Sequence, residues 1–419
     1  MNEVSEPQKR SGSNVKPPKD SIANTASLFG NEKSIEKVFK TYVKTGITEI
    51  DNMLGGGFTP GWVVLGAISN LGKSTFALQL AANIAKFGTP VMFFSLEMPA
   101  DWIAAKLISQ RTFIDSGKDP KKSVMAKDLV NKETVRSEGF NSKWGTVKKA
   151  VNYISQEYKD LYIIDAKSEE YCGKQLTAEA IRDKVKKFIE IDKSHRKPFV
   201  IIDYLQIIPM EDTHSASSDM LSIDHNINIL SKIDKDITVL TISSFNRNSY
   251  KDKMSLSSFK GSGTIEYSAD VILGLDFSML YENPKMFDID AEKANTPRKV
   301  QTMSIKQRYN ASGKKTTVKL DYWSAYDYFE VNNARTEEGS AENNESKGNE
   351  SKQKSEGRQS TGSQTGDVID FFEYCTNSKD LKKTYDKLVK IYHPDNGIGD
   401  NEIMKKINIQ YEKAEEKFK

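Results

Sequence analysis

Cysteine is almost absent from this sequence, because Cys172 and Cys375 are its only two cysteines in 419 residues. Two cysteines cannot build a disulfide framework or a cysteine-rich metal site, so both kinds of small stapled domain are excluded. Long apolar runs are also missing. Residues 1–20 contain no apolar signal core, and no stretch approaches the length of a membrane span. We therefore expect a soluble, cytoplasmic protein that does not contact a membrane.

The sequence has no strong excess of either charge. Its 61 basic and 58 acidic residues give a formal net charge of +3, which is too small to indicate a nucleic-acid partner by itself. The content of 37% hydrophobic residues is enough for a sizeable core. The 28% of charged residues and the mean hydropathy of -0.58 indicate flexible segments beside that core. A chain of this length has room for two or three domains.

Composition divides the chain into five parts. Residues 1–30 are rich in Ser, Asn, Lys and Pro, which predicts a disordered arm. Residues 31–44 contain a short amphipathic helix, and residues 45–330 alternate apolar runs with helical patterns. Residues 331–366 contain almost no aliphatic or aromatic side chain, so we expect a disordered linker that buries nothing. Helical patterns resume in residues 367–419, which predicts a small all-α module.

The apolar runs within the largest part predict an α/β fold. Continuous apolar strands that alternate with helices are typical of a mostly parallel sheet covered on both faces. The predicted strands are GWVVLGAIS, VMFFSLEM, LYIIDA, PFVIIDYLQII, ITVLTISS and DVILGLDF.

Residues 63–80, VVLGAISNLGKSTFALQL, carry most of a phosphate-binding loop. The pattern G-x-x-x-x-G-K-S/T is complete from Gly72 onward, but Ala67 stands where its first glycine is expected. Alanine is tolerable there if its backbone dihedrals stay ordinary, and Asn70 can take a left-handed turn almost as well as glycine. The alternative is a chance Gly-Lys-Ser at a helix start. The flanking strand and helix favour a nucleotide site.

The residue types at this site indicate phosphate chemistry. Backbone N–H groups and the helix N-terminus would cradle the phosphates, Lys73 would reach the β and γ oxygens, and Ser74 would hold Mg²⁺. Asp203 ends an apolar strand as the expected magnesium partner, although such a residue can simply cap a turn. Glu97 follows another strand and could polarise the attacking water. The nucleotide-binding set is Ala67, Asn70, Gly72, Lys73, Ser74, Thr75 and Asp203.

Residues 45–330 resemble the C-terminal motor domain of DnaB-type replicative helicases, a RecA-like P-loop fold. TGITEIDNMLGGGFTPG is similar to that family's entry segment, and FFSLEM and IIDYLQ are similar to two of its signatures. The family often has alanine at the first loop position. The resemblance implies ATP and Mg²⁺ as cofactors, Glu97 as catalytic carboxylate, a hexameric ring, and single-stranded DNA as partner.

Two further segments carry the resemblance. KGSGTIEYSADVIL implies a loop that grips the DNA backbone through Lys260, Gly261 and Gly263. IKQRYNASGKKTTVKL implies that Lys306 and Arg308 act on the γ-phosphate of the neighbouring subunit. Small residues with one cation let a backbone approach phosphates, and several copies around a ring multiply a weak contact, although Gly-Ser loops often only turn the chain. We expect little sequence preference.

The sequence departs from the family pattern in two places. Ser244 stands where the family tends to have a glutamine that senses the γ-phosphate, while Arg247 matches its family position. We expect the family's N-terminal helical domain to be missing, because few residues precede Thr45. We expect the amphipathic helix of residues 34–43 either to pack on an adjacent subunit or to fold back on its own domain.

Residues 367–419 resemble a J-domain, the DnaJ-type module that stimulates DnaK-type chaperones. Two amphipathic helices flank His393, Pro394 and Asp395, and proline stops the first helix so that its neighbours are exposed in the turn. The resemblance implies these three residues as a contact for a DnaK-type chaperone. A His-Pro-Asp tripeptide alone is a weak signal, because proline and aspartate are ordinary turn residues, and such modules can also serve as docking pieces.

Our interpretation of the sequence is an ATP-driven, ring-forming translocase on single-stranded DNA, a helicase of a phage or mobile element that recruits a host chaperone through its tail. Two alternatives remain open. One is a RecA-like ATPase that remodels or loads DNA partners without unwinding, which Ser244 favours. The other is a chaperone adaptor with a nucleotide-gated scaffold, against which the hydrolysis residues argue.

Overall fold

A computed structural model of the chain falls into two compact units, within residues 1–345 and 346–419, which we describe separately. The residues that the structure describes are 22, 26, 29, 42–166, 175–192, 194, 196–209, 219–259, 262–309, 317–332, 381, 382, 385, 386, 389 and 401–416.

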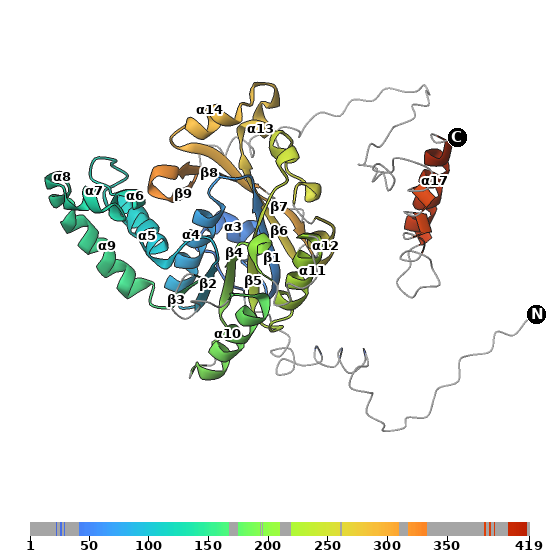
Figure 1. Ribbon diagram of the computed structural model, residues 1–419, viewed down its shortest axis with the longest axis horizontal. Helices are drawn as coiled ribbons and strands as arrows, with labels where there is room; N and C mark the ends of the chain where they lie inside the picture. The colour runs from blue at the N-terminus through green and yellow to red at the C-terminus, as the bar shows by residue number, and fades with distance from the viewer. Residues whose placement is uncertain are drawn as a thin grey trace, which may run out of the picture. The chain divides into compact units, whose positions relative to one another are not determined.

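A nine-stranded sheet is the centre of the first unit as far as the structure describes it, with the order β3-β2-β4-β5-β1-β6-β7-β8-β9 (Figure 1). Its first six strands are parallel and correspond to the six apolar runs of the sequence. They are β1 (Gly61–Ala67), β2 (Val91–Ser95), β3 (Leu161–Asp165), β4 (Phe199–Asp203), β5 (Thr238–Ser244) and β6 (Val271–Phe277). The predicted mostly parallel sheet is confirmed.

Three antiparallel strands extend this sheet beyond β6. They are β7 (Arg298–Gln307), β8 (Thr317–Trp323) and β9 (Tyr328–Val331). The backbone N–H of Asn332 still donates to the carbonyl of Lys319, at 3.0 Å. The last strand of the sheet therefore ends at Val331, and the next residue still bonds to β8.

Helices cover both faces of the sheet. In Figure 1, α4 (Lys73–Lys86) and α5 (Ala100–Asp115) lie to one side with α9 (Trp144–Glu157) beyond them, while α11 (Asp219–Leu230) and α12 (Ser262–Ser268) lie to the other. The inner parallel strands are buried between these helices, and all residues of β2, β4 and β6 are buried. The remaining helices of this unit are α3 (Thr48–Met53), α6 (Ala126–Leu129), α7 (Lys132–Arg136), α8 (Glu138–Asn141), α10 (Ala178–Ile191), α13 (Met279–Glu282) and α14 (Ile289–Ala294).

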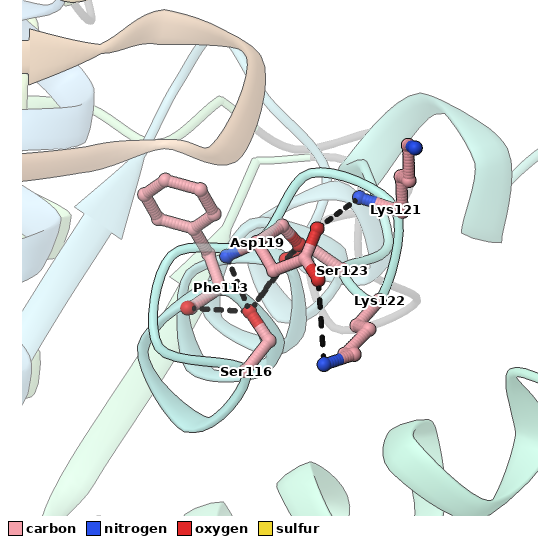
Figure 2. Close-up of polar contacts among 6 residues, drawn as sticks. All are labelled: Phe113, Ser116, Asp119, Lys121, Lys122 and Ser123. Atoms are coloured by element: carbon pink, nitrogen blue, oxygen red, sulfur yellow. Dashed lines mark hydrogen bonds and ion pairs between the residues drawn. The ribbon is translucent and has the colours of Figure 1, made fainter.

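A hydrogen-bonded loop closes the end of α5 (Figure 2). The Ser116 hydroxyl donates to the carbonyl of Phe113, at 2.8 Å, and accepts from the backbone N–H of Asp119, at 3.1 Å. The ring of Phe113 stacks on Tyr326 at a centroid distance of 4.3 Å. This stacking fixes α5 against the turn between β8 and β9, which matters because both elements reach the site described below.

The second unit contains α17 (Asn401–Glu416) and a few described residues of the chain before it. The Tyr385 hydroxyl donates to Asn408 Oδ1 at 2.9 Å, and its ring lies 4.1 Å from that of Tyr411. Leu381 and Ile407 are buried. Tyr385 thus packs on α17.

Among the described residues, we find no helix that is both long and apolar enough to cross a bilayer.

Candidate nucleotide site

The loop between β1 and α4 has the backbone conformation of a phosphate loop. Asn70 has a φ of 64° and Gly72 a φ of 89°, both in the left-handed region. Ala67 instead keeps the extended conformation of β1, where it pairs with Ser244 of β5. A Cβ at Gly72 would lie 2.7 Å from the ring of Tyr322, so both space and conformation require glycine there. The conformational expectations for Ala67 and Asn70 are confirmed.

The lysine of the loop is folded back over it. Lys73 Nζ donates to the carbonyls of Ala67, at 3.2 Å, and Ile68, at 3.1 Å. Burial lowers the pKa of Lys73, and the nearby carboxylates of Asp203 and Glu97 oppose this change. The first turn of α4 has neither a side-chain cap nor an acidic residue. An ammonium group and uncapped N–H groups therefore converge at one point, which suits an anionic ligand.

Strand pairing brings the two predicted carboxylates to the same cleft. Ser95 at the end of β2 is the register partner of Asp203 at the end of β4. The backbone N–H of Leu96 donates to the Asp203 carbonyl at 2.9 Å, so the turn that follows β2 lies over the end of β4. Glu97 and Asp203 line the cleft together with Lys73. Glu97 is exposed and Asp203 is buried.

The buried carboxyl group of Asp203 fits a magnesium site. Asp203 is 1% exposed, and burial raises its pKa to about 6, against the opposing effects of Ser74 and Lys73. The Ser74 hydroxyl favours the charged form, yet neither Asp203 oxygen has a hydrogen-bond partner of normal geometry. Buried polar atoms without partners are unusual in folded proteins. A cation held by Ser74 and Asp203 would give these oxygens a partner.

The donor set also suits magnesium in particular. No cluster of three or more His, Cys, Asp or Glu side chains that could hold a metal occurs within the described part of the chain. Mg²⁺ does not need such a cage, because it is commonly bound by one or two carboxylates, water and substrate phosphates. One carboxylate and one hydroxyl beside a phosphate loop match that habit.

We expect Asp203→Asn to raise the thermal stability of the nucleotide-free protein at neutral pH. Burial raises the pKa of this carboxyl group from 3.8 to about 6, so the folded protein binds its proton more tightly than the unfolded chain does. The free energy of unfolding therefore falls as pH rises through this window, and a penalty of about 3 kcal/mol remains above it. The variant should melt higher than wild type at pH 7.5, and the difference should shrink toward pH 4.

Asp276 provides a matched control for this measurement. Burial also raises the pKa of Asp276 to about 6, but its carboxylate accepts from the N–H of Phe277, at 2.9 Å, and the hydroxyl of Tyr281, at 3.0 Å. Asp276→Asn loses one of these acceptors, so it should gain less stability than Asp203→Asn. Equal melting temperatures of Asp203→Asn and wild type at pH 7.5 would refute the charge penalty at Asp203.

Sequence reasoning missed a lysine in the cleft. Lys106 of α5 lines the cleft, forms an ion pair with Asp327 in the turn before β9, and lies 3.4 Å from the Thr75 hydroxyl. Asp327 follows Lys106 by 221 residues and has a positive φ of 53°. Nothing in the sequence distinguishes Lys106 from the other lysines of amphipathic helices, so no local pattern could have identified it.

An arginine and a tyrosine complete the wall of the cleft. Arg298, at the start of β7, donates to the carbonyl of Asn70 at 2.9 Å, and its guanidinium lies 5.7 Å from the centroid of the Tyr322 ring. The cleft has a volume of about 560 Å³. The predicted residues in its lining are Asn70, Gly72, Lys73, Ser74, Thr75, Glu97 and Asp203.

Lys306 and Arg308 lie near the amino ends of the parallel strands, whereas the cleft lies at their carboxyl ends. Because β7 is antiparallel to β6, Lys306 pairs with Ile272 near the start of β6. Arg308 forms an ion pair with Asp270, at 3.0 Å, and Asp270 accepts from the N–H of Trp62 at the start of β1. The phosphate loop begins five residues later, about 17 Å along the strand. The structure therefore does not bring these two cations to the cleft of their own chain.

The remaining predicted residues are only partly described. Lys260 and Gly261 lie outside the described residues, while Gly263 belongs to α12. His393, Pro394 and Asp395 also lie outside them. Ser244 ends β5 and lines the cleft, and Arg247 is exposed in the following 3₁₀ turn.

A sequence model of the family described as DnaB-like helicase C terminal domain matches residues 42–331 of this chain. The replicative DNA helicase DnaB of Buchnera aphidicola subsp. Baizongia pistaciae is 25% identical over 311 residues, which cover 71% of this chain and 59% of the relative. The same protein of Leifsonia xyli subsp. xyli is 29% identical over 280 residues, covering 64% and 55%. The chain thus spans less than two thirds of the length of these curated relatives.

Two solved structures have the same fold. One of them, described as an ATPase domain, matches with a TM-score of 0.56 at 23% identity and covers 74% of this chain and 98% of that one. A DnaB-like replicative helicase, whose structure was described with its interactions with primase, matches with a TM-score of 0.55 at 20% identity, covering 75% and 67%. The expected RecA-like fold of the α/β unit is confirmed.

Proposed function

Because the chain belongs to the DnaB-like helicase C-terminal domain family, we propose that it is an ATP-driven, ring-forming translocase on single-stranded DNA that acts as a DNA helicase in replication. The observation that carries this proposal is the meeting of Lys73, Ser74, Asp203 and Glu97 in one cleft. A binding module would need the phosphate loop alone. The added carboxylates supply what hydrolysis requires.

Four residues of the cleft have roles in this proposal. Lys73 would contact the β- and γ-phosphates of ATP from the start of α4. Glu97 would accept a proton from the attacking water, for which its exposed position in the cleft is suited. Ser74 and Asp203 would hold Mg²⁺, which would neutralise part of the charge on the phosphates.

A second subunit would complete the site. Lys306 and Arg308 lie near the starts of β6 and β1, too far from their own cleft to act there. Lys306 donates to the carbonyl of Glu266, and burial and the charge of Arg308 lower its pKa. A cation supplied by a neighbouring subunit can stabilise the charge on the transferred phosphoryl group. We propose that a hexameric ring places these cations at the next cleft.

The DNA contact in this proposal is made through phosphates. Residues 260–263, Lys-Gly-Ser-Gly, combine one cation with small residues, and a ring would present several copies to one strand. Contacts of this kind hold a backbone without reading bases, so little sequence preference is expected. A cytoplasmic location and a phage or mobile-element origin belong to the same proposal.

ATP hydrolysis measured with and without single-stranded DNA, together with particle mass, tests the main proposal. We expect a ring-sized particle whose ATP turnover rises with DNA of unrelated sequences, and which separates a forked duplex. DNA-stimulated turnover without strand separation would favour the non-unwinding ATPase that Ser244 suggests. A rate that DNA leaves unchanged, in particles of the expected mass, would reject the translocase.

We also propose that residues 367–419 form a J-domain-like module that recruits a DnaK-type chaperone. The packing of Tyr385 on Asn408 and Tyr411 supports a pair of helices on either side of the His-Pro-Asp turn. The alternative is a chaperone adaptor in which the nucleotide cleft serves only as a scaffold. Retention of Glu97, Lys306 and Arg308 argues against that alternative, since a scaffold needs no hydrolysis residues.

His393→Gln should abolish stimulation of a DnaK-type chaperone by the full chain and leave its own DNA-stimulated ATP hydrolysis intact. The reason is that the residue would face a partner and would not touch the nucleotide carried by the motor. The chaperone's ATPase rate in the presence of wild type and variant measures the effect. If wild type itself fails to stimulate the chaperone of its own host, the tail is a docking piece at most.

A further inference from the structure

The backbone of β1 leaves room for two aromatic rings beside the phosphate loop. At Gly66, a Cβ would lie 2.2 Å from Phe259 Cε1 and 2.5 Å from Phe245 Cε1. Both rings are buried and contact each other edge to face, with centroids 4.9 Å apart. Any residue with a Cβ at this position would have to move one of the rings. We call these two residues the aromatic pair.

The first ring of the aromatic pair is joined to the nucleotide cleft. Phe245 directly follows Ser244, which lines the cleft at the end of β5. Its backbone N–H donates to the carbonyl of Ala67, the first residue of the phosphate-loop pattern, at 3.1 Å. A displacement of either strand end must therefore move Phe245.

The second ring lies at the other end of the same segment. Phe259 directly precedes residues 260–263, and its backbone forms a bridge with that of Phe245. Asn246 strengthens this bridge, because its N–H donates to the carbonyl of Ser258, at 2.8 Å, and its side chain to that of Phe259, at 3.3 Å. The two ends of the segment 245–259 thus move together.

Two further contacts hold the middle of this segment. The Tyr250 hydroxyl accepts from the backbone N–H of Ser69 in the phosphate loop, at 3.2 Å. The N–H of Met254 donates to the Tyr281 hydroxyl, at 2.8 Å, and that hydroxyl donates to Asp276 of β6. The segment is therefore attached to the phosphate loop on one side and to the sheet on the other.

We propose that the aromatic pair, seated on Gly66, couples the nucleotide state of the cleft to DNA binding, through the chain that leaves Phe259 toward the residues for which a DNA contact is proposed. Packed interiors are nearly incompressible, so a shift of the phosphate loop or of the end of β5 is passed from ring to ring. Neither ring touches ATP, and both act as positioning residues. The inference rests on the proposed function, because it presumes a response of ATP hydrolysis to DNA.

Phe259→Leu is the main test, because leucine keeps the site apolar and removes the edge-to-face contact. We expect the ratio of ATPase rates with and without single-stranded DNA to fall about tenfold, while the rate without DNA is retained. A bound ATP analogue should also cease to change the affinity for DNA. Gly66→Ala, which pushes both rings with one added methyl group, should give the same loss.

Phe199→Leu is the matched control. Phe199 is equally buried, and its ring centroid lies 5.4 Å from that of Phe58. It is the first residue of β4, however, and so lies at the amino ends of the parallel strands, away from the cleft. Its replacement should lower the melting temperature and leave the response to DNA unchanged. A purely structural role of the aromatic pair predicts the same for Phe259→Leu.

The outcomes separate this inference from the proposed function. If DNA does not change the ATPase rate of wild type, both the proposed function and the coupling role are rejected. If wild type responds and Phe259→Leu responds equally, the coupling role alone is overturned. Phe245→Leu and the double variant complete a double-mutant cycle for the response of ATPase rate to DNA. If the free-energy losses of the two single variants do not add in the double variant, coupling through the ring contact is supported. If they add, it is contradicted.

Discussion

Arg308→Ala is expected to lower ATP hydrolysis about 10³-fold or more while each subunit still binds ATP. The guanidinium of Arg308 lies beside Asp270 and the carbonyl of Tyr267, at the edge of the sheet away from its own cleft. Its loss cannot disturb nucleotide contacts within the same chain. Its ion pair with Asp270 is partly exposed, so little stability should be lost. Steady-state turnover and the affinity for an ATP analogue, measured on the same preparation, separate the two effects.

Mixing two inactive variants should restore part of this activity. An Arg308→Ala subunit keeps an intact cleft, and a Lys73→Ala subunit keeps an intact arginine. In an equimolar mixture about a quarter of the interfaces combine both intact halves. The control is a mixture of Lys73→Ala with Glu97→Gln, in which both changes damage the cleft and every interface stays defective. No recovery in the first mixture, with mixed particles shown by mass, would contradict a shared site.

Glu97→Gln should lower the turnover number about 10²- to 10⁴-fold without weakening ATP binding. Glutamine keeps the size of the side chain and one oxygen acceptor but cannot accept the proton of the attacking water. Lys73→Ala should lose both hydrolysis and affinity, because Lys73 Nζ already lies at the loop that would hold the phosphates. Single-turnover hydrolysis and nucleotide titration distinguish the two signatures. A normal turnover rate for Glu97→Gln would remove this residue from the catalytic assignment.

Local patterns in the sequence were sufficient for the parts of the fold that depend on neighbours in the chain. The six parallel strands are continuous apolar runs, and the inner strands among them are covered on both faces, whereas the edge strand β3 is partly exposed. Asn70 could be assigned a left-handed conformation because asparagine is one of the few residues besides glycine that adopt it. Glu97 and Asp203 were assigned to one site from their residue types and positions after apolar strands, and they meet because parallel strands end at the same side of the sheet.

The other residues of the cleft depend on contacts that no local pattern records. Arg298 bonds to the carbonyl of Asn70 across 228 residues of chain, and Lys106 pairs with Asp327 across 221. Lysine and arginine are common on exposed helix faces and strand ends. What makes these two part of the site is the extension of the sheet by β7, β8 and β9, which brings the turn at Asp327 next to α4 and α5.

The opposite placement of the phosphate loop and Arg308 also bears on the symmetry of the proposed assembly. A two-fold dimer would have to pair each cleft with the partner's arginine reciprocally, with the two sheets side by side in opposite directions. In the proposed ring the subunits instead associate head to tail, each with the same rotation to the next. Any open arrangement of this kind leaves one terminal cleft without its arginine. Closing the ring removes that defect, so a cleft without its arginine exists only when the ring is open.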